Sequence, residues 1–368
     1  MLKKMDKPLL IISVLLLIIG LIMIFSASNV TSFMKYKTTP YHFFNRQLFF
    51  LAVSLVISFV MLRFNTKTYG YFSWIISLVL IGLLVVVLFY GKLINQARSW
   101  INIRGIQFQP SEFVKIASIV WMSHYISIKK NHGFKSYLLL FGVIIVNTIL
   151  ILLQPDLGTA IIYLSVIFMM FLSCPISSKV KKRILITGGV GIVIVLLLLM
   201  NNGIQVFFER QLQRFDFTAP CSEEKFYTTG TQVCNGYIAF NNGGLAGVGL
   251  GNSTQKYLYL PEAYTDFIFA IITEELGFLG AGLILTMIFI VLWRIFLIAK
   301  KSNDQMGRLM CYGIFWYILL HTLINLGGVM GLMPLTGVPL PFMSYGGSFL
   351  ICLVISLTIV QKVCIESK

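Results

Sequence analysis

Hydrophobic residues in this chain form long uninterrupted runs, and short polar stretches separate one run from the next. A run of about 20 apolar residues is long enough to cross the hydrocarbon core of a bilayer as an α-helix. The pattern predicts ten such helices, near residues 8–28, 45–62, 72–91, 111–128, 136–153, 157–174, 184–200, 266–299, 309–330 and 346–363. We therefore expect an all-α polytopic membrane protein, with residues 1–368 as one integral membrane domain and residues 201–265 as its large extracytoplasmic loop.

The distribution of charge assigns the two sides of the membrane. Short cytoplasmic loops of membrane proteins carry an excess of Lys and Arg. Here most of the 29 basic residues lie at the termini and in the even-numbered loops, which places both termini in the cytoplasm. Of the 13 acidic residues, only Asp6, Asp304 and Glu366 fall on that side. Any acid–base chemistry is therefore expected on the outer face.

Composition supports a membrane protein and argues against a nucleic-acid-binding protein. Charged residues make up 11% of the chain and hydrophobic residues 57%, whereas a soluble domain averages about 25% charged residues. The formal net charge of +16 is spread over short loops and forms no basic stripe, so nucleic acid is not an expected partner. The N-terminal segment resembles a signal peptide but has no small-residue cleavage site, so we expect it to remain as the first helix.

The cysteines and histidines indicate neither a metal site nor a redox motif. The six cysteines form no CxxC pair, and the four histidines are far apart in the sequence. Cys221 and Cys234 share the large loop, where a disulfide is possible if the loop faces an oxidising environment. The sequence leaves that pairing open.

The stretch Leu260–Gly280, reading LPEAYTDFIFAIITEELGFLG, places three carboxylates where the chain enters the membrane. They are Asp266, Glu274 and Glu275. An ionised carboxylate near the bilayer centre costs about 2.5–3.5 kcal/mol on insertion scales, so an acidic residue at membrane depth is a candidate functional residue.

The eighth predicted helix is longer than the membrane is thick. Residues 266–299 would form a helix roughly 50 Å long, against a hydrocarbon core of about 30 Å. The helix therefore either protrudes outward or bends near Gly277 and Gly280. In both cases we expect Asp266 to lie at or above the outer interface, in contact with water.

Proline-containing segments begin the four even-numbered helices that start at the outer face. These segments are Gln109-Pro110-Ser111-Glu112, Gln154-Pro155-Asp156, Leu260-Pro261-Glu262 and the stretch from Pro339 to Gly347. Proline fits the first turn of a helix, and good helix starts alone would explain the pattern. The functional alternative is that four positive helix ends converge on one outer mouth, where free N–H groups suit a phosphate or pyrophosphate.

Charged and polar side chains at the same level are candidates for binding substrate or pyrophosphate. Lys115 follows Glu112 by three residues on one helix face, so the two are expected to pair. The full candidate set is Arg46, Arg98, Glu112, Lys115, Asp156, Lys256 and Ser344.

A glycine-rich segment, Asn242–Gly251, precedes the acidic stretch. It lacks the strand–glycine–helix context of a dinucleotide site. Because glycine allows positive φ and close packing, we expect a re-entrant or tightly turning loop near the bilayer surface.

Together these motifs resemble the SEDS family (shape, elongation, division and sporulation) of bacterial membrane proteins. The run Gly251–Ile271, GNSTQKYLYLPEAYTDFIFAI, is more similar to the division members than to the elongation members. Two positions depart from the family pattern: Tyr264 stands where His is usual, and Phe349 where a second Ser is usual. The matching stretches are residues 98–101, 109–115, 154–160, 232–256, 260–277 and 337–347.

The resemblance implies a ten-helix fold and a peptidoglycan glycosyltransferase that polymerises lipid II on the outer face of the cytoplasmic membrane, at the division septum. Asp266 matches the family's proposed catalytic residue. A class B penicillin-binding protein and other divisome proteins are the implied partners. A divalent cation, Mg²⁺ or Mn²⁺, is the implied cofactor, with its ligands left open and no organic cofactor.

Three alternatives stay open at this point. The chain could polymerise glycan for elongation, act as a lipid II flippase, or serve as a non-catalytic divisome scaffold. A flippase needs polar groups through the depth of the bilayer, whereas the ionisable residues here gather at the outer boundary.

Overall fold

The computed structural model describes residues 2–94, 97–103, 106–128, 137–183, 186, 219–226 and 230–367. A short 3₁₀ helix at Leu2–Lys4 opens the chain. The α-helices are α1 (Lys7–Met34), α2 (His42–Met61), α3 (Thr66–Tyr90), α4 (Pro110–Ile128), α5 (Leu138–Leu152), α6 (Leu157–Ser173), α9 (Glu223–Phe226), α10 (Thr231–Gly243), α11 (Ile268–Lys301), α12 (Gln305–Val329) and α13 (Gly347–Glu366).

The helices agree with the predicted membrane spans wherever the chain is described. The elements α1, α2, α3, α11, α12 and α13 are long and apolar enough to cross a membrane, and α5 and α6 are shorter apolar helices. The predicted span at 184–200 lies outside the described residues. The prediction of a polytopic helical membrane protein is confirmed, and the count of ten stays a prediction.

A small antiparallel sheet follows α3, so the all-α prediction needs correcting to mainly helical. Its strands are β1 (Lys92–Ile94), β2 (Ala97–Ile103) and β3 (Ile106–Phe108), in the order β1-β2-β3. In the register of β2 and β3, Ile101 pairs with Phe108 and Ile103 with Ile106. The run Ser-Trp-Ile-Asn-Ile contains a tryptophan and two isoleucines, residue types that are enriched in strands. It was missed because helix-length apolar runs dominate the pattern.

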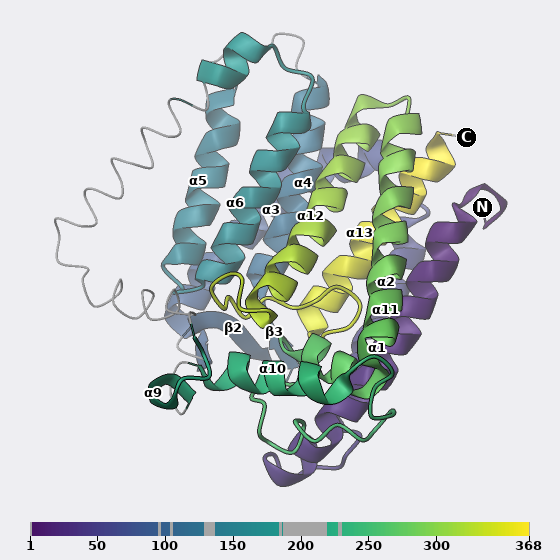
Figure 1. Cartoon of the computed structure of the whole chain (residues 1–368). Coiled ribbons are helices and arrows are strands. Elements are labelled where there is room, and N and C mark those ends of the chain that lie inside the picture. Colours follow the sequence, from purple (N-terminus) through teal and green to yellow (C-terminus); the bar gives the residue numbers. More distant parts are fainter. Residues whose placement is uncertain are drawn as a thin grey trace.

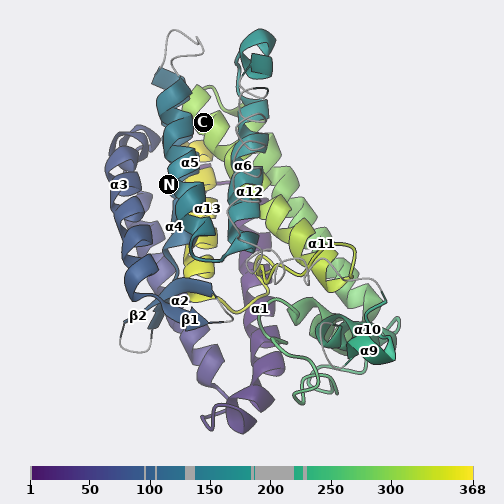
Figure 2. The ribbon, with the colours of Figure 1, turned by 90° about the vertical axis from the view of Figure 1, so that its left-hand side faces the viewer.

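The bundle is built around α13 and α12. In the most apolar stretch of 18 residues of each helix, 83% of the residues in α13 and 56% in α12 are buried, compared with 28% in α2 and in α3. The chain ends of α1 and α13 lie together at one end of the bundle, and α10 crosses the opposite end almost perpendicular to the other helices (Figure 1). The view turned by 90° shows the same arrangement, with α10 beside the start of α11 (Figure 2).

Polar contacts tie the two chain termini at their end of the bundle. Asp6 caps α1, with Oδ1 accepting from the Leu9 N–H at 3.0 Å. The same carboxylate forms an ion pair with Arg294 of α11. The backbone N–H and C=O of Asp6 bond the Gln361 amide of α13 at 2.9 and 3.0 Å. Three helices distant in sequence are thereby joined at one residue.

Helix α11 is broken at Gly277, which has φ 71° and ψ 178°. The glycine loop, defined as residues 244–251, supplies the backbone partners that the break leaves free. Its Gly247 backbone fits so closely that a Cβ at Gly277 would lie 2.4 Å from the Gly247 nitrogen. Of the two predicted options for the long helix, the bend is therefore confirmed. The four backbone bonds run from Val248 N to Glu274 O (3.0 Å), Gly249 N to Glu275 O (3.0 Å), Phe278 N to Gly244 O (2.9 Å) and Leu279 N to Leu245 O (3.2 Å).

Candidate functional site

Asp266 lies two residues before α11, and α11 begins at the end of the bundle opposite the chain termini (Figure 1). The Thr265 hydroxyl donates to its Oδ1 at 2.9 Å. The amide of Asn325, in α12, donates to the Asp266 carbonyl and to the Val338 carbonyl, both at 2.7 Å. A Cβ at exposed Gly337 would lie 3.8 Å from Oδ2. One carboxylate oxygen therefore faces a hydroxyl, and the other faces an exposed turn.

The expectation that Asp266 contacts water freely is wrong, because its exposed fraction is only 9%. The segment between α12 and α13, which we call the strap (residues 331–346), folds over residues 260–267, which we call the Asp266 loop. The Ser344 hydroxyl donates to the Thr265 carbonyl at 2.6 Å, and the Tyr345 N–H donates to the Tyr264 carbonyl at 2.9 Å. Ser344 is thus a buried connector, with its oxygen also accepting from the Leu340 N–H at 2.7 Å.

Burial changes the acidity of this carboxyl. Loss of hydration and, to a smaller extent, the negative charge of Glu262 raise the pKa of Asp266, the hydrogen bond from Thr265 partly opposes the rise, and the resulting pKa is about 7. A general base works best when its pKa lies near the operating pH. The site therefore holds a carboxylate suited to accepting a proton near neutral pH.

Glu262 is a site residue that the sequence analysis named only as part of a helix start. Its Oε2 lies 2.9 Å from the Thr265 hydroxyl, which also contacts Asp266. Two carboxylates thus flank one hydroxyl. The spacing of four residues between Glu262 and Asp266 was the available signal, but nothing in the sequence shows that the segment turns back on itself.

An aromatic wall stands beside the Asp266 loop. The ring of Tyr264 lies 4.4 Å from that of Phe43 in α2 and 5.8 Å from that of Tyr345, between ring centroids. Burial raises the pKa of Tyr345, and the nearby positive charge of Arg46 opposes the rise. Tyr264, one of the two departures from the family pattern, therefore packs against the rings of Phe43 and Tyr345. Half-buried Arg46 lies close to this aromatic wall.

Lys115 and Glu112 form the predicted ion pair inside the bundle, with Nζ 2.8 Å from Oε1 and both side chains at most 4% exposed. Lys115 Nζ also lies 3.1 Å from His321 Nε2 in α12, and His321 Nδ1 lies 3.4 Å from the Pro339 carbonyl of the strap. Phe349, the second departure from the family pattern, packs its ring 4.8 Å from His321. The positive charge of the Lys115 ammonium group is thus compensated by the Glu112 carboxylate inside the bundle.

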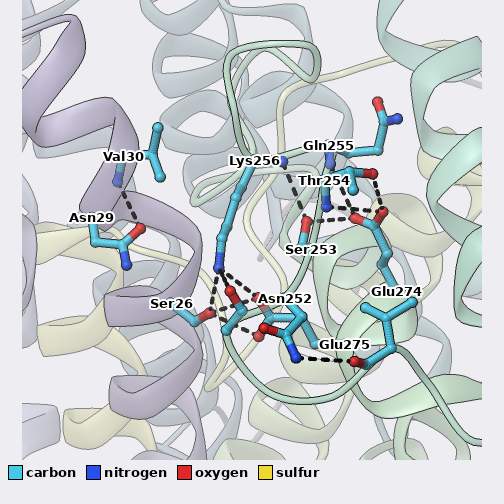
Figure 3. Close-up of polar contacts among 12 residues, drawn as sticks. Ser26, Asn29, Val30, Asn252, Ser253, Thr254, Gln255, Lys256, Glu274 and Glu275 are labelled. Atoms are coloured by element: carbon cyan, nitrogen blue, oxygen red, sulfur yellow. Dashed lines mark hydrogen bonds and ion pairs between the residues drawn. The ribbon is translucent and has the colours of Figure 1, made fainter.

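Lys256 is held in the same way at the glycine loop (Figure 3). Its Nζ lies 3.0 Å from Glu275 Oε1, and the Ser26 hydroxyl of α1 donates to the same carboxylate at 2.6 Å. Glu274 beside it accepts from the Thr254 hydroxyl at 2.9 Å and from Ser253. These two glutamates therefore hold residues 252–256 and α1 against the break in α11 (Figure 3). The expected availability of Lys115 and Lys256 to a pyrophosphate does not fit their burial and pairing.

Asp156 caps α6, because its Oδ1 accepts from the Thr159 N–H at 3.1 Å. Its Oδ2 accepts from the Gln109 amide at 3.0 Å, and the Gln109 N–H donates to the Ser348 hydroxyl at 2.9 Å. The starts of α4, α6 and α13 therefore meet, which are three of the four helix ends that the functional alternative brings together. Arg98, in β2, is exposed at this end of the molecule.

Cys221 and Cys234 form a disulfide. It joins the α9 segment to α10, which supports the Asp266 loop from outside. The Asn235 amide donates to the Tyr259 carbonyl at 2.9 Å, and a Cβ at Gly236 would lie 3.3 Å from the ring of Phe267. The disulfide thus fixes α10, and α10 packs against Phe267, the residue after Asp266.

Within the described part of the chain, no three His, Cys, Asp or Glu side chains are grouped closely enough to hold a metal ion. Mg²⁺ is usually bound through one or two carboxylates together with substrate phosphates and needs no such group, so the expected divalent cation stays a prediction.

Comparison with known proteins identifies close relatives over the whole chain. A family model described as "Cell cycle protein", covering FtsW, RodA and SpoVE, matches residues 7–368. A Bacillus subtilis protein named as a probable peptidoglycan glycosyltransferase FtsW is 38% identical, over 100% of this chain and 92% of the relative. Stage V sporulation protein E of Bacillus subtilis is 34% identical over 99% of this chain and 98% of that protein.

Solved structures share the fold. A chain from a peptidoglycan synthase complex matches with a TM-score of 0.77 and 23% identity, over 98% of this chain and 97% of that one. The rod shape determining protein RodA of Thermus thermophilus matches with a TM-score of 0.69 and 22% identity, over 98% and 96% of the two chains.

Proposed function

The chain belongs to the FtsW/RodA/SpoVE family of cell cycle proteins, and on this premise we propose that it is a peptidoglycan glycosyltransferase polymerising lipid II for septal wall synthesis. The observation that carries the proposal is Asp266, a nearly buried carboxylate with a pKa of about 7 at the end of the bundle away from the termini. The curated relative named as a probable peptidoglycan glycosyltransferase supports the choice of reaction.

In the proposed reaction, Asp266 takes the proton from the 4-hydroxyl of the acceptor N-acetylglucosamine. A lone pair on that hydroxyl oxygen attacks the anomeric carbon of the donor chain. The bond between the anomeric carbon and the diphosphate oxygen breaks, and undecaprenyl diphosphate leaves. General-base catalysis of this kind contributes about 10²–10⁴-fold. The oxygen Oδ2 is the natural acceptor, since it faces exposed Gly337 and Oδ1 faces Thr265.

The leaving diphosphate needs positive charge that is not already paired. Arg46 and Arg98 supply it in this proposal, because they are half-buried and exposed respectively, whereas Lys115 and Lys256 are buried in ion pairs. The joined starts of α4, α6 and α13 add helix N-termini, which favour anions. Glu112, Asp156 and Ser344 then act by holding this end of the bundle together.

Topology, location and partners complete the proposal. Ten helices would place both termini in the cytoplasm and the 201–265 loop outside, where the Cys221–Cys234 disulfide is chemically suited to an oxidising space. The chain would act in the cytoplasmic membrane at the division septum, with a class B penicillin-binding protein and other divisome proteins. The structural neighbour in a peptidoglycan synthase complex supports a synthase partner by fold. Support by Mg²⁺ or Mn²⁺ stays a prediction.

A reconstitution experiment tests the proposal against its rivals. The purified chain with its penicillin-binding partner, placed in proteoliposomes with lipid II in the outer leaflet, is expected to produce long glycan strands. Movement of lipid II across the bilayer without polymer would identify a flippase. Polymer from the partner alone, with no change when this chain is added, would identify a scaffold.

A further inference from the structure

We propose that the Thr265 hydroxyl and the Glu262 carboxylate form the route by which the proton taken up by Asp266 leaves the site. This inference rests on the proposed function, since it concerns the step after Asp266 has acted as base. It assigns a role to two residues beyond the single catalytic carboxylate.

The geometry places one hydroxyl between two carboxylates. Thr265 Oγ1 lies 2.9 Å from Asp266 Oδ1 and 2.9 Å from Glu262 Oε2. Both distances are within the range of O–H···O hydrogen bonds. A threonine hydroxyl has one proton to donate and two lone pairs to accept, so it can accept from one carboxyl while donating to the other.

Burial makes such a route necessary. Asp266 is 9% exposed, and a general base must lose its proton before each new turnover. Its Oδ2 faces Gly337, on the side left for the acceptor sugar. On the other side, Glu262 is half-buried and so reaches solvent. On that side, the Thr265 hydroxyl joins Asp266 to a carboxylate that contacts solvent.

The transfer balances atom by atom. The proton is taken up at Oδ2, and rotation of the Asp266 carboxyl group turns the protonated oxygen toward Thr265. Asp266 then gives this proton to the Thr265 oxygen while Thr265 passes its own hydroxyl proton to Glu262. Glu262 then releases that proton to water, and both carboxylates return to the ionised form. No further reactant is needed. Thr265 ends with the same hydroxyl it had at the start, so only a reorientation of its O–H is required before the next turnover.

One competing acceptor is present. The Thr265 hydroxyl also lies 3.1 Å from the backbone carbonyl of Glu262. When both carboxylates are ionised, the single proton can point to only one of these acceptors. Protonation of Asp266 adds a donor on the other side of the oxygen, which favours the orientation toward Glu262 that the relay needs.

Paired substitutions test the relay in the chain assembled with its penicillin-binding partner. Thr265→Val keeps the shape without the hydroxyl, and Thr265→Ser restores the hydroxyl. Glu262→Gln still accepts the hydrogen bond but is a far weaker base. Thr148→Val is the matched control, because Thr148 is buried in α5 and its hydroxyl bonds the Ile144 carbonyl at 2.8 Å.

We expect Thr265→Val and Glu262→Gln each to lower kcat for lipid II polymerisation about tenfold, which is less than the roughly 10²–10⁴-fold that general-base catalysis contributes, because Asp266 itself is still present. KM should not change, and the solvent isotope effect in D₂O should rise because proton release becomes rate-limiting. Thr265→Ser should recover most of kcat, and Thr148→Val should match the wild type. Melting temperature and lipid II binding check that each variant is folded.

Several results would overturn the relay. These are a Thr265→Val enzyme as fast as the wild type, a Thr265→Ser enzyme as slow as Thr265→Val, or slow variants with an unchanged isotope effect. An Asp266→Asn arm separates this failure from that of the proposed function. If Asp266→Asn is inactive while Thr265→Val is normal, only the relay fails. If Asp266→Asn is fully active, the assignment of the base fails and the relay fails with it.

Discussion

At the scale of single residues, burial changes what each charged side chain does. Asp266 is enclosed beside one hydroxyl and another carboxylate, which raises its pKa to about 7. Lys115 is enclosed beside a carboxylate and a neutral imidazole nitrogen, so its charge stays matched. Asp266 and Lys115 are both buried, but in this account Asp266 is the reactive group and Lys115 is a structural one.

The pKa of Asp266 predicts the pH dependence of the reaction. A base works only when ionised, so the rate should rise with pH through about 7, the value to which burial and Glu262 raise the Asp266 pKa. Glu262→Gln removes a neighbouring negative charge and should move the midpoint of the rise to lower pH. Initial polymerisation rates measured from pH 5.5 to 8.5 check both points. A midpoint that stays in place in Glu262→Gln would show that the two carboxylates do not interact.

Lys115 should behave as a structural residue. Lys115→Met leaves the Glu112 charge buried without a partner, and removing one member of a buried pair lowers stability by about 3–5 kcal/mol. The double variant Lys115→Met with Glu112→Leu should regain most of that stability, because no uncompensated charge remains. Thermal unfolding in detergent is the measurement. A Lys115→Met protein of normal stability but weak lipid II binding would instead favour a diphosphate role.

At the scale of elements, the glycine loop and α11 form one unit. The break at Gly277 frees backbone groups that residues 244–249 then bond. Glu274 and Glu275, one on each side of this unit, hold residues 252–256 and α1. Asp266 lies two residues before α11, so we expect the position of the base to depend on how α11 is broken.

Replacing Gly277 tests that dependence. In Gly277→Ala, a φ of 71° strains the backbone, and the new Cβ would lie 2.4 Å from the Gly247 nitrogen. We expect a loss of both stability and polymerisation. The control is Gly282→Ala on the same helix, where nothing lies within 4 Å and where alanine should stabilise by about 0.5–1 kcal/mol. Equal melting temperatures for the two variants would mean that the loop does not fix α11.

The sequence predicted these elements unevenly, for physical reasons. Long apolar runs give the membrane helices directly, and 34 residues in α11 required either a protrusion or a bend. The motif around Asp266 pointed to this carboxylate as the proposed base. Its burial was not predictable, because the strap that covers it lies more than 60 residues further along the chain. The short strands β1 to β3 were missed since their pattern spans only a few residues beside much stronger helical signals.

At the scale of the whole molecule, the two ends of the bundle have different roles. The end that holds both termini is fastened by Asp6, Arg294 and Gln361. The opposite end carries Asp266, the joined helix starts, α10 and the strap. The proposed base and the joined helix starts gather at the second end, which is the arrangement expected of an enzyme working on one face of a membrane.

Weakening the fastened end should lower stability without changing the chemistry. Asp6→Ala removes a helix cap and an ion pair, and charged hydrogen bonds of this kind contribute about 1.5–3 kcal/mol. The melting temperature should fall, while the pH midpoint of polymerisation should stay that of the wild type. Lys3→Ala, at an exposed neighbouring position, is the control. A shifted pH midpoint in Asp6→Ala would show that the two ends are coupled.

The most direct measurement is the rate of lipid II polymerisation by Asp266→Asn, purified with its penicillin-binding partner and compared with the wild type. Asparagine keeps the size of the side chain but does not act as a base at neutral pH. The account predicts a rate at least about 100-fold lower, with lipid II binding and melting temperature unchanged. A variant that polymerises lipid II at the wild-type rate would contradict the assignment of Asp266 as the catalytic base.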